Sequence, residues 1–225
     1  MYLKRPNLPV SQPQWSLNRV LTYIDNLPEP LSMVNLLRKS AFLLLLATGW
    51  RISELHACVR LIDFCRFTHD ASLLLRPHEC FLAKNERPYK RWNHKQISPL
   101  LLPGDVVSKL CPVSTLKEYL SRSEKGRTDA LFQPICKETK PLTKHGLSTQ
   151  ICQLVLDADP QTKAKVHDIR KYASTYALTQ TMLVGELQKA IGWSSPVTFF
   201  RHYLAACEPL KVNAVLPVLN PRVQN

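Results

Sequence analysis

The stretch AFLLLLATGWRISEL, residues 41–55, decides how this chain folds. Its first half is apolar on every side, and a helix of that kind is buried by other parts of the protein. We therefore predict a central buried helix that begins after Ser32, a residue type that caps helix N-termini well. Gly49 breaks this helix, and Arg51 then starts a second helical segment from a rigid base.

Further helices are predicted on both sides of this stretch. Apolar residues recur at three- and four-residue spacing between Ser16 and Pro28, which predicts a helix that the proline ends. After Pro112 the same kind of pattern returns several times. It predicts helices at 113–123, 144–157, 167–180, 184–191 and 196–204.

The region between these helices predicts strands. Residues 71–75, 79–84 and 96–101 are short apolar stretches separated by prolines and polar residues, which is typical of a small antiparallel sheet. The predicted fold class is therefore mainly α with a small three-stranded antiparallel β-sheet. Between the last two strands lies a basic loop that also contains Tyr89 and Trp92. Such a loop is either a solvated hairpin tip or a contact for the DNA backbone.

The charge of the chain indicates the kind of partner it binds. Its 225 residues hold 30 Lys and Arg against 17 Asp and Glu, a formal net charge of +13 at pH 7. An excess of this size predicts a polyanion such as nucleic acid, because each phosphate that a protein neutralises releases condensed counterions. The alternative is a basic, solvated surface without a partner.

The composition also bears on the compartment. The longest strongly apolar run, 41–47, is far shorter than the roughly 20 residues that span a membrane, and no signal-peptide core follows the basic N-terminus. The seven cysteines are scattered and lack a Cys-x-x-Cys pair, which indicates free thiols rather than disulfides or a metal site. We expect an intracellular protein, in the nucleus or the cytoplasm, without a metal or other cofactor.

Two motifs contain arginines that suit a phosphate group. Arg51 follows the buried helix and its glycine break, and Glu54 is placed to orient it or to cap the next helix. His167 and Arg170 are three residues apart, so they share one face of a predicted helix, at an N-terminus that favours an anion. Either motif alone is more often a solvated surface, although the planar fork of arginine matches two phosphate oxygens.

Two aromatic residues follow these motifs in the chain. Trp193 lies in the segment Ile-Gly-Trp-Ser-Ser-Pro, and its indole N–H can only donate, so it could bind a phosphate oxygen without taking a proton. Tyr203 comes after Phe199 and Phe200, which can anchor a short helix in the core, so it projects near the helix end. Taken singly, each of the two residues is more often part of the packing.

The order of these motifs resembles the tyrosine recombinase (phage integrase) family. An arginine after an apolar helix and glycine, a lysine on a β-hairpin, His-x-x-Arg, Gly-Trp and a late tyrosine follow in that family's order. The segments at 13–21, 81–85 and 193–203 are most similar to recombinases of DIRS-type retrotransposons, with Crypton transposons as the alternative. By this resemblance the catalytic residues are Arg51, Lys84, His167, Arg170, Trp193 and Tyr203.

The resemblance also implies the reaction. Tyr203 attacks a DNA phosphodiester to form a 3′-phosphotyrosyl bond, while the arginines stabilise the phosphate and Lys84 protonates the departing 5′-oxygen. His167 accepts the tyrosine proton or holds the phosphate. Trp193 stands where many members have histidine. Its spacing to the tyrosine is one residue longer than in many members, which leaves His202 close to the expected register.

The remaining basic residues are expected to hold the DNA duplex without reading its sequence. Lys90 and Lys95 are also alternatives to Lys84 as the catalytic lysine. The expected DNA-binding residues are Arg87, Lys90, Arg91, Lys95, Lys137, Lys140, Lys144, Lys163 and Lys165.

The chain is expected to divide into three parts. These are an N-terminal arm at 1–14, a tyrosine recombinase catalytic domain at 15–208 and a C-terminal tail at 209–225 that docks on a neighbouring subunit. The expected partner is double-stranded DNA, bound by a homo-oligomer, with no membrane and no small-molecule substrate. The alternatives are a DNA-binding domain that has lost catalysis and an enzyme like the type IB topoisomerases, which share the tyrosine chemistry.

Overall fold

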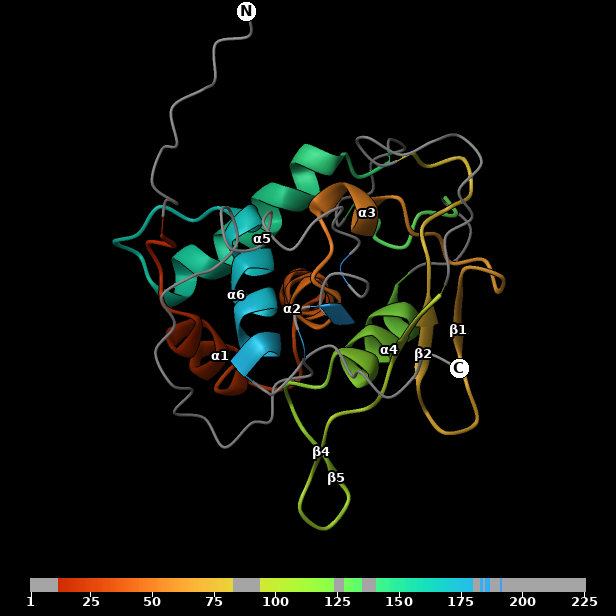
Figure 1. The fold of residues 1–225 in the computed structure, drawn as a ribbon, viewed down its shortest axis with the longest axis horizontal. Helices are drawn as coiled ribbons and strands as arrows, with labels where there is room; N and C mark the ends of the chain where they lie inside the picture. Colours follow the sequence, from red (N-terminus) through yellow and green to blue (C-terminus); the bar gives the residue numbers. More distant parts are fainter. Residues whose placement is uncertain are drawn as a thin grey trace, which may run out of the picture.

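The computed structural model of the chain describes residues 12–82, 94–123, 128–134 and 141–179, together with positions 183, 185, 186 and 191. Within them the fold is mainly helical, with two small antiparallel sheets (Figure 1). The helices are α1 (Leu17–Asp25), α2 (Met33–Thr48), α3 (Ile52–His56), α4 (Pro112–Arg122), α5 (Lys144–Ala158) and α6 (Val166–Thr179). The strands are β1 (Cys65–Phe67), β2 (Leu73–Leu75), β3 (Lys95–Ile97), β4 (Leu101–Leu102) and β5 (Val106–Val107).

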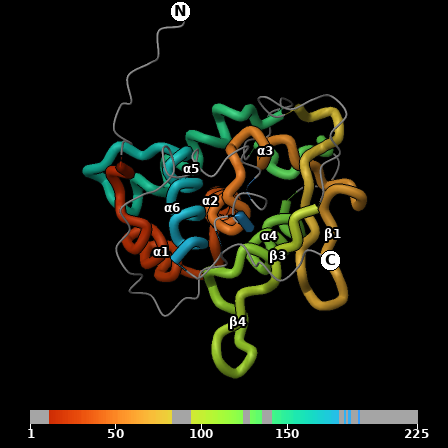
Figure 2. Tube along the Cα trace, in the orientation of Figure 1, coloured from red at the N-terminus to blue at the C-terminus, as the bar shows by residue number. Residues whose placement is uncertain are grey.

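Helix α2 is the centre of the molecule, and Figures 1 and 2 show it end-on with α4, α5 and α6 packed around it. It begins after Ser32, whose hydroxyl accepts the backbone N–H of Asn35, and its residues from Lys39 onward are all buried. It ends at Gly49, which takes the left-handed conformation with φ of 63° and donates its N–H to Leu45. The predicted buried helix is therefore confirmed, and the glycine break leads directly into Arg51 and α3.

The helices predicted before α2 and between α4 and α6 are also confirmed, with ends that agree within two residues. Side-chain caps fix several of these ends. Ser16 accepts the N–H of Arg19 at the start of α1, and Thr143 accepts the N–H of Gly146 at the start of α5. Among the described helices, none has the length and apolarity that crossing a lipid bilayer requires. The helices predicted at 184–191 and 196–204 lie wholly or mostly outside the described residues.

The three-stranded sheet has the order β1-β2-β3, with antiparallel pairing throughout. Leu73 of β2 lies opposite Phe67 of β1 and Ile97 of β3, and the side chains of Leu73, Leu75 and Ile97 are buried. The sheet therefore presents one apolar face to the helical body. This confirms a small three-stranded antiparallel sheet, although one of its strands differs from the prediction.

The strand predicted at 79–84 is wrong over its described part, residues 79–82. The Phe81 N–H donates to the His78 carbonyl, and the Cys80 N–H donates to the His78 imidazole, so the chain turns here. Glu79 and Cys80 are exposed, and no burial alternation supports a strand. The third strand is instead β1, whose three residues are too few to give a recognisable alternating pattern in the sequence.

A second hairpin, β4–β5, was not predicted. It projects from the body of the protein (Figure 1), and its four strand residues are all apolar and exposed. Its turn places Gly104 and Asp105 at φ of 80° and 60°, conformations that glycine and aspartate accept more readily than most residues. The sequence does not reveal this hairpin, because its strand residues are apolar like those of a buried strand and Leu101 falls within the strand predicted at 96–101.

The N-terminal segment before α1 fastens α6 to α2. Trp15 is buried with its ring 4.7 Å from the ring of Tyr172 in α6 and 6.2 Å from that of Phe42 in α2. The Tyr172 hydroxyl also donates a hydrogen bond to the Trp15 carbonyl. These contacts fix the position of α6 relative to the central helix, and α6 carries two of the predicted site residues.

The central role of α2 predicts a large effect of truncating its side chains. Leu44→Ala should lower the free energy of unfolding by about 3 kcal/mol, because Leu44 is fully buried and the substitution leaves a cavity. Leu102→Ala on the exposed hairpin is the matched control and should change it by less than about 0.5 kcal/mol. Urea unfolding measures both values, and equal losses would contradict the central position of α2.

Candidate active site

One buried carboxylate joins two arginines that are far apart in the chain. Glu54 in α3 is only 3% exposed. Its Oε2 accepts the backbone N–H of Arg51 at 2.8 Å, and its Oε1 accepts the Nη1 of the same arginine at 3.1 Å. The Nη1 of Arg170 in α6 lies 3.6 Å from Oε2. Glu54 therefore both caps α3 and holds the two guanidinium groups at one place.

Arg170 is the buried member of this pair. It is 1% exposed, and its Nη1 donates to the Gly49 carbonyl at 2.8 Å while its Nη2 donates to the Ile191 carbonyl at 3.3 Å. A buried charge is tolerated only when it is paired and hydrogen-bonded, and these partners come from three separate segments. Arg170 thus connects the end of α2, helix α3 and the segment that leads to Trp193.

Arg51 is the accessible member of the pair. It is the N-cap residue of α3, immediately after the Gly49 break and Trp50, and its side chain is 37% exposed. Its backbone is fixed by the hydrogen bond to Glu54, and its guanidinium group lies at the edge of the protein surface. An anion approaching from solvent therefore meets Arg51 first, with Arg170 behind it.

His167 lies at the start of α6, one residue after the helix begins, as the sequence predicted. The residue is exposed at the surface, yet the protein atoms around the imidazole partly desolvate it and lower its pKa. The positive charges of Arg170, Lys171 and Arg51 lower this pKa further, against the opposing charge of Asp168. These surroundings favour the neutral imidazole, which is the form that can accept a proton.

Lys95 is a described lysine close enough to Glu54 and Arg170 to feel their charges. It begins β3, opposite Leu75 of β2. Burial lowers its pKa to about 8, the charge of Arg170 adds to this, and the charge of Glu54 opposes it. An amine with such a pKa exchanges its proton readily near neutral pH, which suits general acid or base chemistry.

The structure brings four of the predicted residues together. Arg51, Arg170 and Lys95 lie near Glu54, and His167 lies near the two arginines. Lys144, Lys163 and Lys165 are also described, and all three are exposed. The remaining predicted site residues lie outside the described residues, namely Lys84, Arg87, Lys90, Arg91, Lys137, Lys140, Trp193 and Tyr203.

Sequence reasoning missed a second buried ion pair in α6. The Nζ of Lys171 lies 3.0 Å from Oδ1 of Asp168, and both side chains are less than a tenth exposed. The only signal in the sequence is a pair of opposite charges three residues apart, which ordinarily indicates a solvated helix face. Burial of the pair follows from the packing of α6 against α2 and α5.

Positive charge exceeds negative charge in this group of residues. Arg51, Lys95, Arg170 and Lys171 are cations, whereas Glu54 and Asp168 are the described carboxylates among them. An excess of positive charge in a partly buried site attracts an anion, because charges interact more strongly there than in water. The arrangement therefore suits the binding of a phosphate group.

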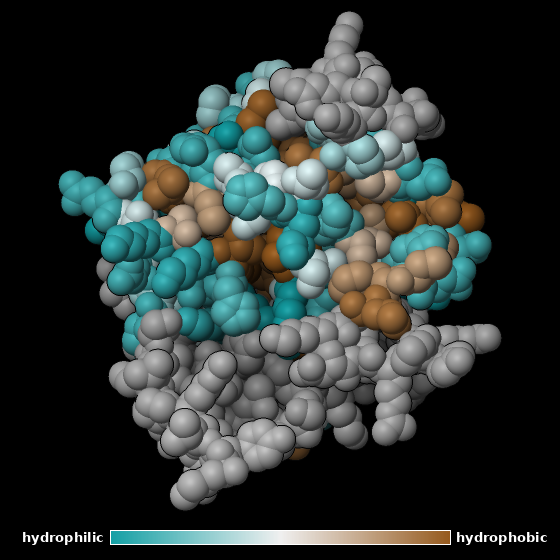
Figure 3. All heavy atoms as spheres, turned by 90° about the horizontal axis from the view of Figure 1, so that it is seen from above, coloured by the Kyte–Doolittle hydropathy of each residue, from teal (hydrophilic) through white to brown (hydrophobic). Residues whose placement is uncertain are grey.

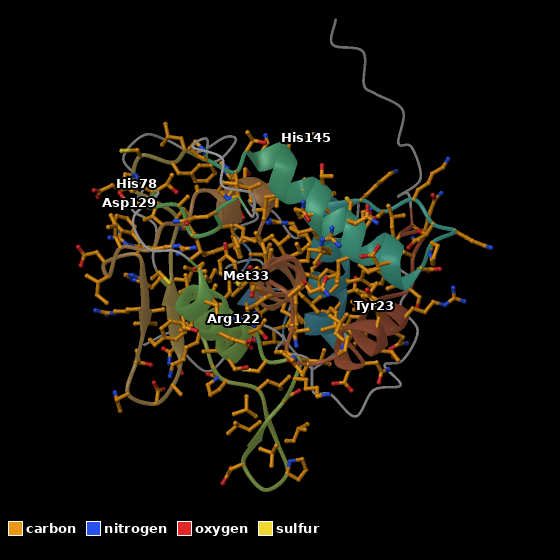
Figure 4. The ribbon with its side chains drawn as sticks, turned by 180° about the vertical axis from the view of Figure 1, so that it is seen from behind. Tyr23, Met33, His78, Arg122, Asp129 and His145 are labelled. Carbon is orange, nitrogen blue, oxygen red and sulfur yellow. The ribbon has the colours of Figure 1, made fainter. Side chains whose placement is uncertain are left out.

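The surface next to the site is polar. The Nε2 of His56 in α3 donates to the Leu142 carbonyl at 2.8 Å, which holds the start of α5 beside α3. Lys144 and His145 are exposed there, and Figure 4 shows His145 at the end of α5 that lies away from Tyr23 of α1. Seen from above the view of Figure 1, the described surface has broad hydrophilic areas with smaller hydrophobic patches between them (Figure 3). Such a surface is compatible with a large charged partner.

Because Glu54 contacts both arginines, we expect that removing its charge lowers the stability of the protein more than removing the charge of an exposed carboxylate. Glu54→Gln should lower the free energy of unfolding by about 3 kcal/mol, because buried Arg170 then lacks its counter-charge. The matched control is Glu118→Gln, which neutralises a pair of similar length with Arg122 on the surface of α4. That change should stay below about 1 kcal/mol, since exposed ion pairs contribute little. Urea unfolding measures the free energy of unfolding of both variants. Equally small decreases for the two variants would contradict the role of Glu54.

The fold is that of a tyrosine recombinase catalytic domain, as solved structures show. The XerA recombinase superposes with a TM-score of 0.59 and 19% identity, over 92% of this chain and 63% of that one. The XerH site-specific recombinase bound to difH substrate gives 0.58 and 16%, over 86% and 50%. The Tn1549 transposon integrase, solved in complex with circular intermediate DNA, gives 0.51 and 14%, over 90% and 63%.

The chain spans between half and just under two thirds of the length of these solved proteins. Comparison with curated proteins finds no match. The model of the phage integrase family matches residues 15–208, which is most of the chain and includes every predicted catalytic residue. This chain therefore belongs to the phage integrase family, the tyrosine recombinases.

Proposed function

We propose that this chain cuts and rejoins DNA through a covalent bond between Tyr203 and a 3′-phosphate, in site-specific recombination or in the integration of a mobile element. The observation that carries the proposal is the meeting of Arg51 and Arg170 on Glu54, with His167 near both arginines. Membership of the phage integrase family supports it, and relatives of the same fold were solved with DNA substrates.

The two arginines answer the main difficulty of the reaction. A phosphodiester is an anion that repels a nucleophile, and a phenol with a pKa of about 10 is a poor nucleophile at neutral pH. Arg51 and Arg170 would bind the non-bridging oxygens and stabilise the charge that grows on them in the transition state. Because Glu54 fixes both guanidinium groups beforehand, little reorganisation is needed when the charge develops.

Proton transfers complete the proposed mechanism. His167 would take the proton of Tyr203 as the bond from the phenol oxygen to phosphorus forms. Trp193 would donate a hydrogen bond to a phosphate oxygen, and Lys84 would protonate the 5′-oxygen as its bond to phosphorus breaks. The 3′-phosphotyrosyl bond stores the energy of the broken phosphodiester. Attack by a 5′-hydroxyl can therefore rejoin the strand without ATP.

The basic residues around the site would hold the duplex. Lys144 at the start of α5 and the exposed Lys163 and Lys165 before α6 lie on the described surface. The same role is proposed for Lys95 at the start of β3 and for five residues outside the described ones, namely Arg87, Lys90, Arg91, Lys137 and Lys140. The net charge of +13 supports a DNA partner, and contacts of this kind position a duplex without reading its sequence.

The biological setting is a further part of the proposal. Segments 13–21, 81–85 and 193–203 support a recombinase of a DIRS-type retrotransposon, with a Crypton transposon as the alternative. Such a protein would act in the nucleus or cytoplasm, as a homo-oligomer on DNA. Residues 15–208 would form the catalytic domain after an arm at 1–14, and the apolar tail at 209–225 would dock on a neighbouring subunit.

Covalent trapping tests the central claim. On a nicked suicide substrate the wild-type chain should give a protease-sensitive, covalently shifted DNA band, and Tyr203→Phe should abolish it because the nucleophilic oxygen is missing. Tyr23→Phe on α1 is the matched control and should still give the band. DNA binding without any adduct from the wild type would favour a domain that has lost catalysis. Relaxation of supercoiled plasmid without joining of two sites would favour a topoisomerase.

A modified substrate identifies the lysine. A 5′-bridging phosphorothiolate releases a thiolate, which needs no proton because thiols have a pKa near 8.5. Lys84→Ala should cleave ordinary DNA about 100-fold or more slowly and recover nearly fully on the modified DNA. Lys95→Ala should lose rate on both substrates, since Lys95 lies with Glu54 and Arg170 at the phosphate site. Recovery of Lys95→Ala alone would instead assign the proton donor to Lys95.

A further inference from the structure

The buried pair of Asp168 and Lys171 has no part in the mechanism given above. Its two charged atoms are 3.0 Å apart, and the side chains are 4% and 6% exposed. The pair occupies the first two turns of α6, the same turns that carry His167 and Arg170. The buried pair of Asp168 and Lys171 therefore lies directly beside His167 and Arg170, and not farther along the helix.

A buried ion pair of this kind is not by itself evidence of added stability. Removing two charges from water can cost as much as their attraction returns, so replacing such a pair by apolar residues is often neutral or stabilising. Within the described part of the chain, the Glu54–Arg170 contact has side chains that are as deeply buried, 4% and 1% exposed. That contact belongs to the candidate active site, which indicates that the second pair serves the site as well.

The geometry of the helix connects the pair with His167. Lys171 is four residues after His167, so the two side chains are neighbours on one face of α6. The charged groups that act on the imidazole are Arg170, Lys171 and Asp168 from α6 and Arg51 from the start of α3. Lys171 lowers the pKa of His167 more strongly than Asp168 raises it. The pair as a whole therefore favours the neutral imidazole.

We propose that Lys171, held in place by Asp168, is a positioning residue that keeps His167 unprotonated and able to accept the proton of Tyr203. Asp168 is needed because a buried lysine without a counter-charge gives up its own proton. In the step served, the phenol proton moves to the imidazole as the oxygen–phosphorus bond forms. The bond from phosphorus to the 5′-oxygen breaks, and that oxygen takes its proton from the catalytic lysine. This inference rests on the proposed function.

Titration of His167 by NMR tests the electrostatic part without any DNA. The His167 signal is identified by its loss in His167→Gln. Lys171→Met removes the neighbouring cation and should raise the pKa of His167, whereas Lys171→Arg keeps the charge and should leave it as in the wild type. The double variant Asp168→Asn with Lys171→Met should give an intermediate pKa, because it also removes the opposing charge. An identical His167 titration in all these proteins would overturn the inference.

The pH profile of covalent adduct formation tests the link to the reaction. The rate falls as pH drops through the pKa of His167, since a protonated imidazole cannot accept a proton. Lys171→Met should therefore move the acidic limb to higher pH, with a several-fold loss at about pH 6 and little loss at about pH 8. A purely structural role would lower the rate equally at every pH, and that result would overturn the inference.

The titration and the adduct assay together distinguish a failure of this inference from a failure of the proposed function. If Lys171→Met fails to fold, the double variant decides, because it leaves no buried charge unpaired. Absence of any adduct from the wild-type chain would overturn the proposed function. The order of the His167 titrations among the variants would still decide whether Lys171 controls the imidazole.

Discussion

The burial of one carboxylate between two guanidinium groups is the constraint on which the rest of the site depends. Glu54 caps α3 through the backbone of Arg51 and pairs with Arg170 in α6, so it fixes two helices and two arginines together. A charge that is nearly inaccessible to water must be paired, and the pairing here leaves little freedom to any of the three residues. The two guanidinium groups are thus held together by the protein itself, which is what the proposed stabilisation of developing charge requires.

The central helix makes this arrangement possible. Because α2 is buried on every side, its end at Gly49 is a fixed point, and the glycine carbonyl accepts a hydrogen bond from Arg170. The chain then enters α3 at Arg51 without a flexible connection. Desolvation and the charge of Arg170 lower the pKa of both His167 and Lys95. The packing that buries Arg170 at the end of α2 therefore also affects the titratable groups near it.

The sequence predicts the long helices of this fold more accurately than its short strands. The helices have enough residues to repeat a 3.6-residue pattern several times, and capping residues such as Ser16, Ser32 and Thr143 mark their starts. Strands of two or three residues give no repeat of their own. The apolar stretches at 71–75 and 96–101 predict β2 and β3, but no such stretch marks β1, and the strand predicted at 79–84 is wrong over its described part. In that segment the imidazole of His78 accepts a backbone N–H and supports a turn, a contact that no apolar pattern announces.

The sequence by itself determined the helical framework, the small sheet and the family motifs around Arg51, His167 and Arg170, because these depend on spacing along one element. Only the tertiary structure decided which distant groups meet. The approach of Arg170 to Glu54, its hydrogen bond to the Ile191 carbonyl and the nearness of Lys95 are contacts between separate segments. The burial of Asp168 with Lys171 likewise depends on what packs over α6. Spacing fixes which face of a helix a residue occupies, whereas the packing of other elements fixes what that face meets.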